Sequence, residues 1–133
     1  MIADSSAILA ILRAEAEASA CARAIEAATS RRISAANFLE SAIVIDGSRD
    51  PVASRRLDDL LREAKFVIEP VTEEQAKIAR EAYRDFGKGS GNPAQLNFGD
   101  CFAYALAKVA GEPLLFKGDD FTHTDIAPVI GIR

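Results

Sequence analysis

The chain has 133 residues, of which 49% are hydrophobic, so it is long enough for one domain with a substantial core and too apolar for wholesale disorder. Its 16 basic and 20 acidic residues give a net charge of −4, which excludes a protein that binds nucleic acid through bulk positive charge. No apolar run reaches the roughly 20 residues that a membrane helix needs, no secretory signal is visible, and two cysteines with one histidine cannot form a zinc site. We therefore expect a single cytoplasmic domain over residues 1–133, without membrane association, in which Cys21 and Cys101 are buried, reduced thiols.

In chain order, short apolar runs alternate with stretches of helix-forming residues. The predicted elements are a strand (1–3), two helices (7–12 and 15–28), a strand (31–34), a helix from 35 to about 45, a helix opened by Asp50-Pro51, a strand (66–68), a helix from Thr72 to about Phe86, a glycine-rich loop (87–93), a helix (98–110) and a strand (113–116). Strands separated by helices predict an α/β fold, in which a mainly parallel central sheet is flanked by helices.

Asp4 and the pair Asp119-Asp120 each follow a predicted strand. Functional sites in parallel sheets gather just beyond the carboxyl ends of the strands, so we expect these acids at one edge of the sheet. Asp4 also precedes a helix, and because Asp is a good N-cap, a purely structural role for Asp4 alone stays open. In the functional interpretation Asp4 holds a divalent cation, and Ser6 lies within reach to orient it.

Glu40 is predicted to lie on an apolar helix face, because its neighbours at −4, +3 and +4 are Ala36, Ile43 and Val44. This pattern predicts that the Glu40 side chain is buried. An unpaired buried carboxylate costs on the order of several kcal/mol, so Glu40 must be neutral, paired with a cationic side chain or bound to a metal. Ion pairing and a role in a site are equally open for this residue taken alone.

Asp100 belongs to the first turn of the last predicted helix, where an acid also stabilises the helix dipole. The residues at +3, +4 and +7 are Ala103, Tyr104 and Ala107, so we expect this face of the helix to point inward. Gly99, directly before it, permits a close approach of another segment. Asp100 is therefore the third candidate for a shared acidic site.

Carboxylates that are brought together repel one another unless a cation neutralises them. Oxygen ligands without cysteine or histidine favour Mg²⁺ or Mn²⁺ over zinc, and a carboxylate-bound Mg²⁺ with open positions is suited to phosphodiester hydrolysis. Two other interpretations stay open. One is a haloacid-dehalogenase-like phosphatase with Asp4 as covalent nucleophile, although Ser6 occupies the place where such enzymes usually carry a second acid. The other is a non-catalytic module whose acids dock a basic peptide.

Four segments in this order resemble the PIN-domain family, and specifically the VapC-type toxins of prokaryotic toxin–antitoxin pairs. They are residues 2–7, 37–40, 96–105 and 113–126, which together extend over essentially the whole chain. The resemblance implies a three-layer α/β/α fold and a Mg²⁺- or Mn²⁺-dependent endoribonuclease that cleaves tRNA or other structured RNA. It also implies a homodimer that is silenced by a cognate VapB antitoxin, or, in the alternative, a PIN-like binding module without catalysis.

The same resemblance assigns roles to individual residues. Asp4, Glu40 and Asp100 match the three acids that gather the metal, and Ser6 matches the hydroxyl residue that supports the first acid. The fourth acid falls in the pair Asp119-Asp120. Asp120 is preferred because it directly precedes an aromatic residue, and Asp119 stays open.

RNA has to approach this acidic pocket on a protein of net negative charge, so basic residues around it are expected to hold the flanking phosphates. The candidates near the predicted site loops are Arg13, Lys88 and Lys117, with Arg80 and Arg84 on the preceding helix. For each of them, a solvated surface position is the alternative.

Overall fold

The computed structural model describes residues 1–129. Its elements are β1 (Ile2–Ala3), α1 (Ser5–Leu12), α2 (Ala18–Ala27), β2 (Arg32–Ser34), α3 (Ala35–Gly47), α4 (Pro51–Glu63), β3 (Val67–Glu69), α5 (Glu73–Phe86), α6 (Phe98–Ala110), β4 (Leu114–Leu115) and a 3-10 helix, η1 (Asp120–His123). Their order along the chain is the predicted one, and four helix starts follow the side chains that cap them, those of Ser34, Asp50, Thr72 and Asn97.

Two helix starts differ from the prediction by two or more residues. Helix α1 begins at Ser5 rather than at residue 7, because the Asp4 side chain already caps it there. Helix α2 begins only at Ala18, because the chain turns sharply after α1: Ala14 has a positive φ of 52°, and the Glu15 N–H donates to the Ala10 carbonyl at 2.9 Å.

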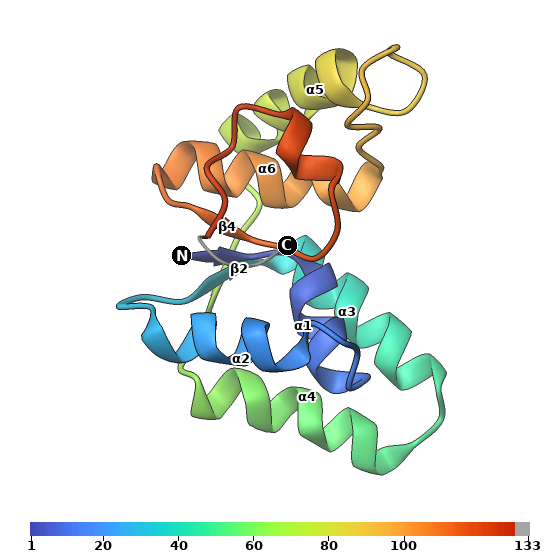
Figure 1. Cartoon of the computed structure of the whole chain (residues 1–133), viewed down its shortest axis with the longest axis vertical. Coiled ribbons are helices and arrows are strands. Elements are labelled where there is room, and N and C mark those ends of the chain that lie inside the picture. The colour runs from blue at the N-terminus through green and yellow to red at the C-terminus, as the bar shows by residue number, and fades with distance from the viewer. Residues whose placement is uncertain (130–133) are drawn as a thin grey trace.

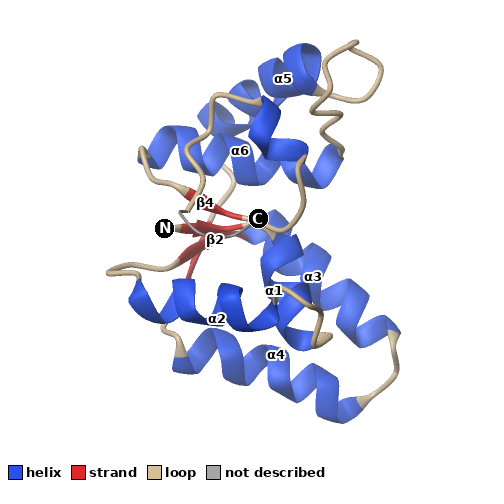
Figure 2. Ribbon diagram, in the orientation of Figure 1, coloured by secondary structure: helices blue, strands red, loops and turns tan. Residues whose placement is uncertain are grey.

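The strands form one parallel sheet in the order β3-β2-β1-β4. In Figure 2 they lie together, in red, between the helices. Helices α5 and α6 cover one face of this sheet, and α1, α2, α3 and α4 lie on the other side (Figure 1). Helix α3 also contacts α6, so the two helical layers meet at one edge of the sheet. The predicted three-layer α/β/α architecture with a parallel sheet is confirmed.

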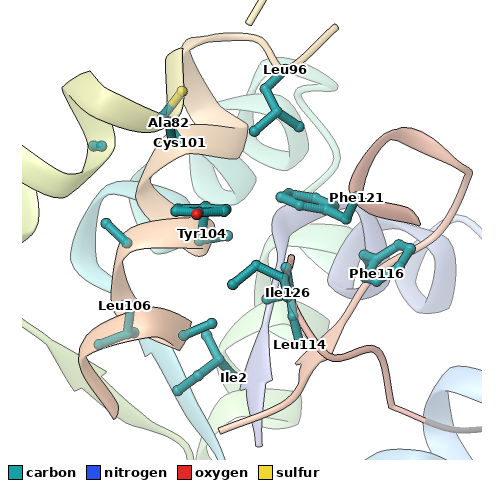
Figure 3. Close-up of a cluster of buried hydrophobic side chains, with 14 of the residues drawn as sticks. Ile2, Ala82, Leu96, Cys101, Tyr104, Leu106, Leu114, Phe116, Phe121 and Ile126 are labelled. Atoms are coloured by element: carbon teal, nitrogen blue, oxygen red, sulfur yellow. The ribbon is translucent and has the colours of Figure 1, made fainter. Parts of the chain in front are cut away.

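The core lies on both faces of the sheet, because successive residues of a strand point to opposite sides. Ile2 and Leu114 pack in a cluster with Tyr104 of α6 (Figure 3). Ala3 and Leu115 pack in a second cluster, against the helices of the other layer. Burial of each large aliphatic side chain contributes about 1.5–3 kcal/mol, so the two short strands β1 and β4 are held by their packing on both faces of the sheet.

Cys21 and Cys101 are free and buried, as predicted. Within residues 1–129, no helix combines the length and the apolar character that crossing a bilayer requires.

Candidate active site

The predicted site acids come from four separate parts of the chain. Asp4 follows β1, Glu40 lies in α3, Asp100 lies in the first turn of α6, and Asp120 begins η1 after β4. The Asp4 N–H donates to the carbonyl of Leu115 at 2.9 Å, so the ends of β1 and β4 are fastened side by side. The topology thus brings these segments to the carboxyl edge of the sheet.

Asp4 combines a capping role with a position in the acidic site. Its side chain is 3% exposed, and its Oδ2 accepts the Ser6 N–H at 3.0 Å, which caps α1. Burial raises the pKa of Asp4 from 3.8 to about 7; hydrogen bonds from Ser6 oppose this rise, and the charges of Asp100 and Glu40 add to it. The Asp4 carboxyl group therefore caps α1 and also lies among the acids at the edge of the sheet, so a structural role does not exclude a functional one.

The predicted burial of Glu40 on an apolar stripe is wrong. Ile43 is 61% exposed, Ala36 and Val44 are only half-buried, and so is Glu40 itself. The helical period marks an apolar face but does not say whether that face is covered, and here part of it lies open. The Glu40 carboxylate is instead held by local donors: the Ser5 hydroxyl donates to its Oε1 at 2.5 Å.

Asp100 also has two roles. It forms a reciprocal capping box with Asn97, whose N–H donates to Asp100 Oδ2 at 3.0 Å while the Asp100 N–H donates to Asn97 Oδ1 at 2.9 Å. Burial raises the pKa of Asp100; the bond from Asn97 opposes the rise, the charges of Asp120 and Glu40 add to it, and Lys88 lowers it. Its helix face points inward as predicted, with the residues at +3, +4 and +7 all buried.

Asp119 and Asp120 are both exposed, but they differ in what they contact. The main-chain carbonyl of Asp119 accepts two hydrogen bonds from Thr122, one from its N–H at 3.0 Å and one from its hydroxyl at 2.5 Å, and these close the turn of η1. Asp120 is the member of the pair whose charge acts on Asp100.

These acids act on one another and are not held in ion pairs within the described part of the chain. None of the ion pairs formed within residues 1–129 involves Asp4, Glu40, Asp100 or Asp120. For the described part of the chain, the alternative of an ion-paired Glu40 is thus not realised. Burial and like-charged neighbours thus favour the neutral form of Asp4, and a cation at this edge of the sheet would favour its charged form.

The residues present fit a hard divalent cation, because the donors are carboxylate and hydroxyl oxygens. As they stand, no three Asp, Glu, His or Cys side chains within residues 1–129 are close enough to hold a metal ion. The acids would therefore have to move inward on a cation, and that cation would have to offset both the burial that chiefly raises the pKa values of Asp4 and Asp100 and the smaller contribution of their like-charged neighbours. The Glu40 carboxylate already lies directly against the Gly99 backbone, where a Cβ would overlap it.

The basic residues predicted to contact RNA have different surroundings. Lys117 pairs with Glu15 at 2.6 Å and with Glu17 at 3.7 Å, so its charge is already balanced. Arg84 pairs with Asp85 at 2.9 Å, and Arg13 is exposed at the end of α1.

Lys88 and Arg80 line a cavity of about 520 Å³ between α5 and α6. The same cavity is lined by Tyr83 and by Phe98, which is 77% exposed. Lys88 is close enough to lower the pKa of Asp100, so this cleft adjoins the acidic site.

Ser5 and Asn37 were not singled out from the sequence, although both contact Glu40. The spacing of Asn37 and Glu40, three residues apart on one helix, is the signal that could have indicated their contact. At Ser6, the N–H donates to Asp4 at 3.0 Å. The Ser6 Oγ accepts the N–H of Lys117 at 2.9 Å, and the role of Ser6 in the site stays a prediction.

A model of the PIN-domain family matches residues 1–127. The chain is 62% identical over 133 residues to ribonuclease VapC28 of Mycobacterium tuberculosis, with 100% of both chains covered. Among solved structures, it resembles VapC20 of Mycobacterium tuberculosis, a Sarcin-Ricin loop cleaving toxin, with a TM-score of 0.77 and 16% identity over 96% of this chain and 97% of that one. A toxin–antitoxin complex from Klebsiella pneumoniae matches with a TM-score of 0.66 and 18% identity over 90% of this chain and 88% of that chain. The chain belongs to the PIN-domain family, in the VapC group that its sequence predicts.

Proposed function

We propose that this protein is the endoribonuclease toxin of a type II toxin–antitoxin pair and that it hydrolyses RNA with Mg²⁺ or Mn²⁺ held by Asp4, Glu40 and Asp100. The full-length identity to VapC28, which is named a ribonuclease, supports the activity. The observation that carries the metal assignment is the buried Asp4 carboxyl, which faces the charges of two further acids without an ion-pair partner among residues 1–129.

Each side chain of the site has a defined task in this proposal. Ser6 orients Asp4 through its N–H, and the capping box with Asn97 fixes Asp100 at the start of α6. We assign the fourth acidic position to Asp120 because its charge reaches Asp100. A bound Mg²⁺ would supply polarisation of the scissile phosphate and a water with a lowered pKa.

RNA is expected to enter along the cleft between α5 and α6. Lys88 and Arg80 can hold phosphates there, and the exposed rings of Tyr83 and Phe98 offer surfaces on which unpaired bases stack. Of the basic residues predicted from the sequence, Lys88 is therefore the best placed for this task, whereas the charge of Lys117 is occupied by Glu15.

A VapB-type antitoxin is the proposed protein partner, in keeping with the toxin–antitoxin complex that shares this fold. Exposed apolar side chains next to the acids, those of Leu39, Ile43 and Phe98, provide a surface that a protein can cover. Assembly of the toxin as a homodimer is likewise proposed.

The test is cleavage of cellular RNA by the purified, antitoxin-free protein. Cleavage should require Mg²⁺ or Mn²⁺ and stop with EDTA. The cleavage rate should fall by about 100-fold or more in Asp4→Asn and in Asp100→Asn. Asp58→Asn, which alters an exposed acid on α4, is the matched control and should cleave like the wild type. Cleavage that persists in EDTA or in either site variant would reject the metal assignment, and a folded protein inert towards all RNA would favour the non-catalytic binding module.

A further inference from the structure

Asn37 lies on α3, one turn before Glu40, and its polar side chain is completely buried. Its Nδ2 donates to the carbonyl of Gly99 at 3.0 Å and to Glu40 Oε1 at 3.4 Å. Both partners are acceptors, so the side-chain nitrogen must face them and the amide has one orientation. Its Oδ1 is left buried without a partner in the described structure, an unfavourable arrangement that packing alone would not select.

Ser5 supplies a second donor to the same carboxylate oxygen. Its Oγ lies 2.5 Å from Glu40 Oε1 and 3.2 Å from the main-chain carbonyl of Asn37. A hydroxyl has one proton to donate, and the shorter distance to the charged acceptor assigns that proton to Glu40. Glu40 Oε1 is thus held from two directions, while Oε2 lies against the Gly99 backbone.

We propose that Asn37 and Ser5 are positioning residues of the metal site: they hold the Glu40 carboxylate in place, and Asn37 at the same time ties it to the first turn of α6. The inference rests on the proposed function, since it concerns how the acids are set for a cation. Gly99 directly precedes Asp100, so the bond from Asn37 to its carbonyl links α3, next to Glu40, to the turn of α6 that carries Asp100.

This arrangement explains why a half-buried, flexible glutamate has a defined position. Free Glu40 would choose among several rotamers, and a cation would have to select one of them at an entropic cost. With Oε1 fixed by two donors, the carboxylate is already oriented before a cation binds. Removal of groups that orient metal ligands typically lowers metal affinity by about 10- to 100-fold.

The experiment measures Mn²⁺ affinity by isothermal titration calorimetry on the purified, antitoxin-free protein. The variants are Asn37→Ala and Ser5→Ala, with Ser41→Ala as control. Ser41 is also completely buried on α3, and its hydroxyl donates to the Asn37 carbonyl at 2.9 Å, so its loss removes a comparable buried bond that does not touch Glu40. We expect the affinity for Mn²⁺ to fall about 10-fold or more in the first two variants and to stay within about twofold in Ser41→Ala.

A second measurement separates positioning from general loss of structure. Because neither side chain is assigned a contact with RNA, raising the Mn²⁺ concentration should restore cleavage to Asn37→Ala and Ser5→Ala, whereas it cannot rescue a misfolded protein. If Asn37→Ala is unfolded at the assay temperature, Ser5→Ala decides, because alanine is well tolerated in the first turn of a helix. Wild-type-like Mn²⁺ affinity in folded Ser5→Ala, or in folded Asn37→Ala, would overturn the inference. A wild type that binds no Mn²⁺ would instead reject the proposed function itself.

Discussion

Gly99 and Glu40 face each other so closely that a Cβ on residue 99 would overlap the Glu40 carboxylate. The two residues lie on α6 and α3, the helices that meet where the two layers join. The missing side chain thus lets a glutamate from one layer lie against the backbone that leads into Asp100.

The substitution Gly99→Ala should therefore separate stability from activity. Alanine favours a helix by about 1 kcal/mol over glycine, and the clash concerns the far end of a flexible side chain, so the fold should persist. The displaced Glu40 carboxylate should lower Mn²⁺ affinity and RNA cleavage about 10-fold or more. Gly47→Ala is the matched control, since a Cβ there meets nothing within 4 Å, and it should leave both quantities unchanged. Equal Mn²⁺ affinity and equal RNA cleavage in the two alanine variants would show that the function of Glu40 does not depend on its contact with Gly99.

The metal-free protein should lose stability as the pH rises towards neutrality. Burial raises the pKa of Asp4 to about 7, so the folded protein holds a proton there that the unfolded chain releases near pH 3.8. The contribution of this proton to the free energy of unfolding is fully present below the unfolded pKa of 3.8 and is lost as the pH rises through the folded pKa of about 7. At 1.36 kcal/mol per unit it amounts to on the order of 4 kcal/mol.

Urea unfolding in EDTA between pH 4 and 8, an interval that contains the folded pKa of Asp4, measures this effect. Asp4→Asn is the comparison, because asparagine caps a helix equally well and carries no titrating proton. The wild type should lose stability relative to this variant across the interval. Parallel curves for the two proteins would contradict a raised pKa at Asp4.

Asp100→Asn should raise the melting temperature of the metal-free protein while RNA cleavage is lost. The pKa of Asp100 is raised despite the hydrogen bond from Asn97, which means that the neutral side chain is the better tolerated one in the folded state. An asparagine oxygen can still accept the Asn97 N–H of the capping box, so most of the helix start is kept. Thermal melts in EDTA test this, and a clear drop in melting temperature would show that the structural role of the charge outweighs repulsion.

Lys88 and Lys117 should differ in their contributions to RNA binding. Lys88 is exposed beside the acidic site and has no ion pair within residues 1–129, whereas Lys117 is balanced by Glu15. Lys88→Ala should weaken RNA binding and lower the salt dependence of log K by about one unit, as expected for one lost phosphate contact. Lys117→Ala should leave that slope unchanged. RNA binding measured across a salt series distinguishes the two variants. Equal slopes of log K against log salt would show that Lys88 does not contact an RNA phosphate.

Much of this architecture is readable from the sequence because local rules decide it. Capping residues such as Ser34 and Asn97 mark helix starts by a bond to a nearby N–H, and short apolar runs between helices predict parallel strands. The acids at strand ends could be predicted for the same reason: once β1 and β4 are parallel neighbours, their carboxyl ends must share an edge. The family resemblance then linked Glu40 and Asp100 to that edge.

What the sequence could not reveal depends on contacts between distant segments. The exposure of Ile43 follows from the absence of any described element over that face of α3, which no periodicity encodes. The bond from Asn37 to Gly99 joins residues that are 62 positions apart. The pairing of Lys117 with Glu15 depends in the same way on the turn that precedes α2.

The uncovered hydrophobic side chains of Leu39, Ile43 and Phe98 surround the same edge where the acids gather. A partner that shields them from water gains binding energy from that burial and, by its position, bars RNA from the cleft. On the proposed pairing with an antitoxin, solubility and silencing would be two results of a single association, and removal of the antitoxin would expose the acidic site and an aggregation-prone surface together.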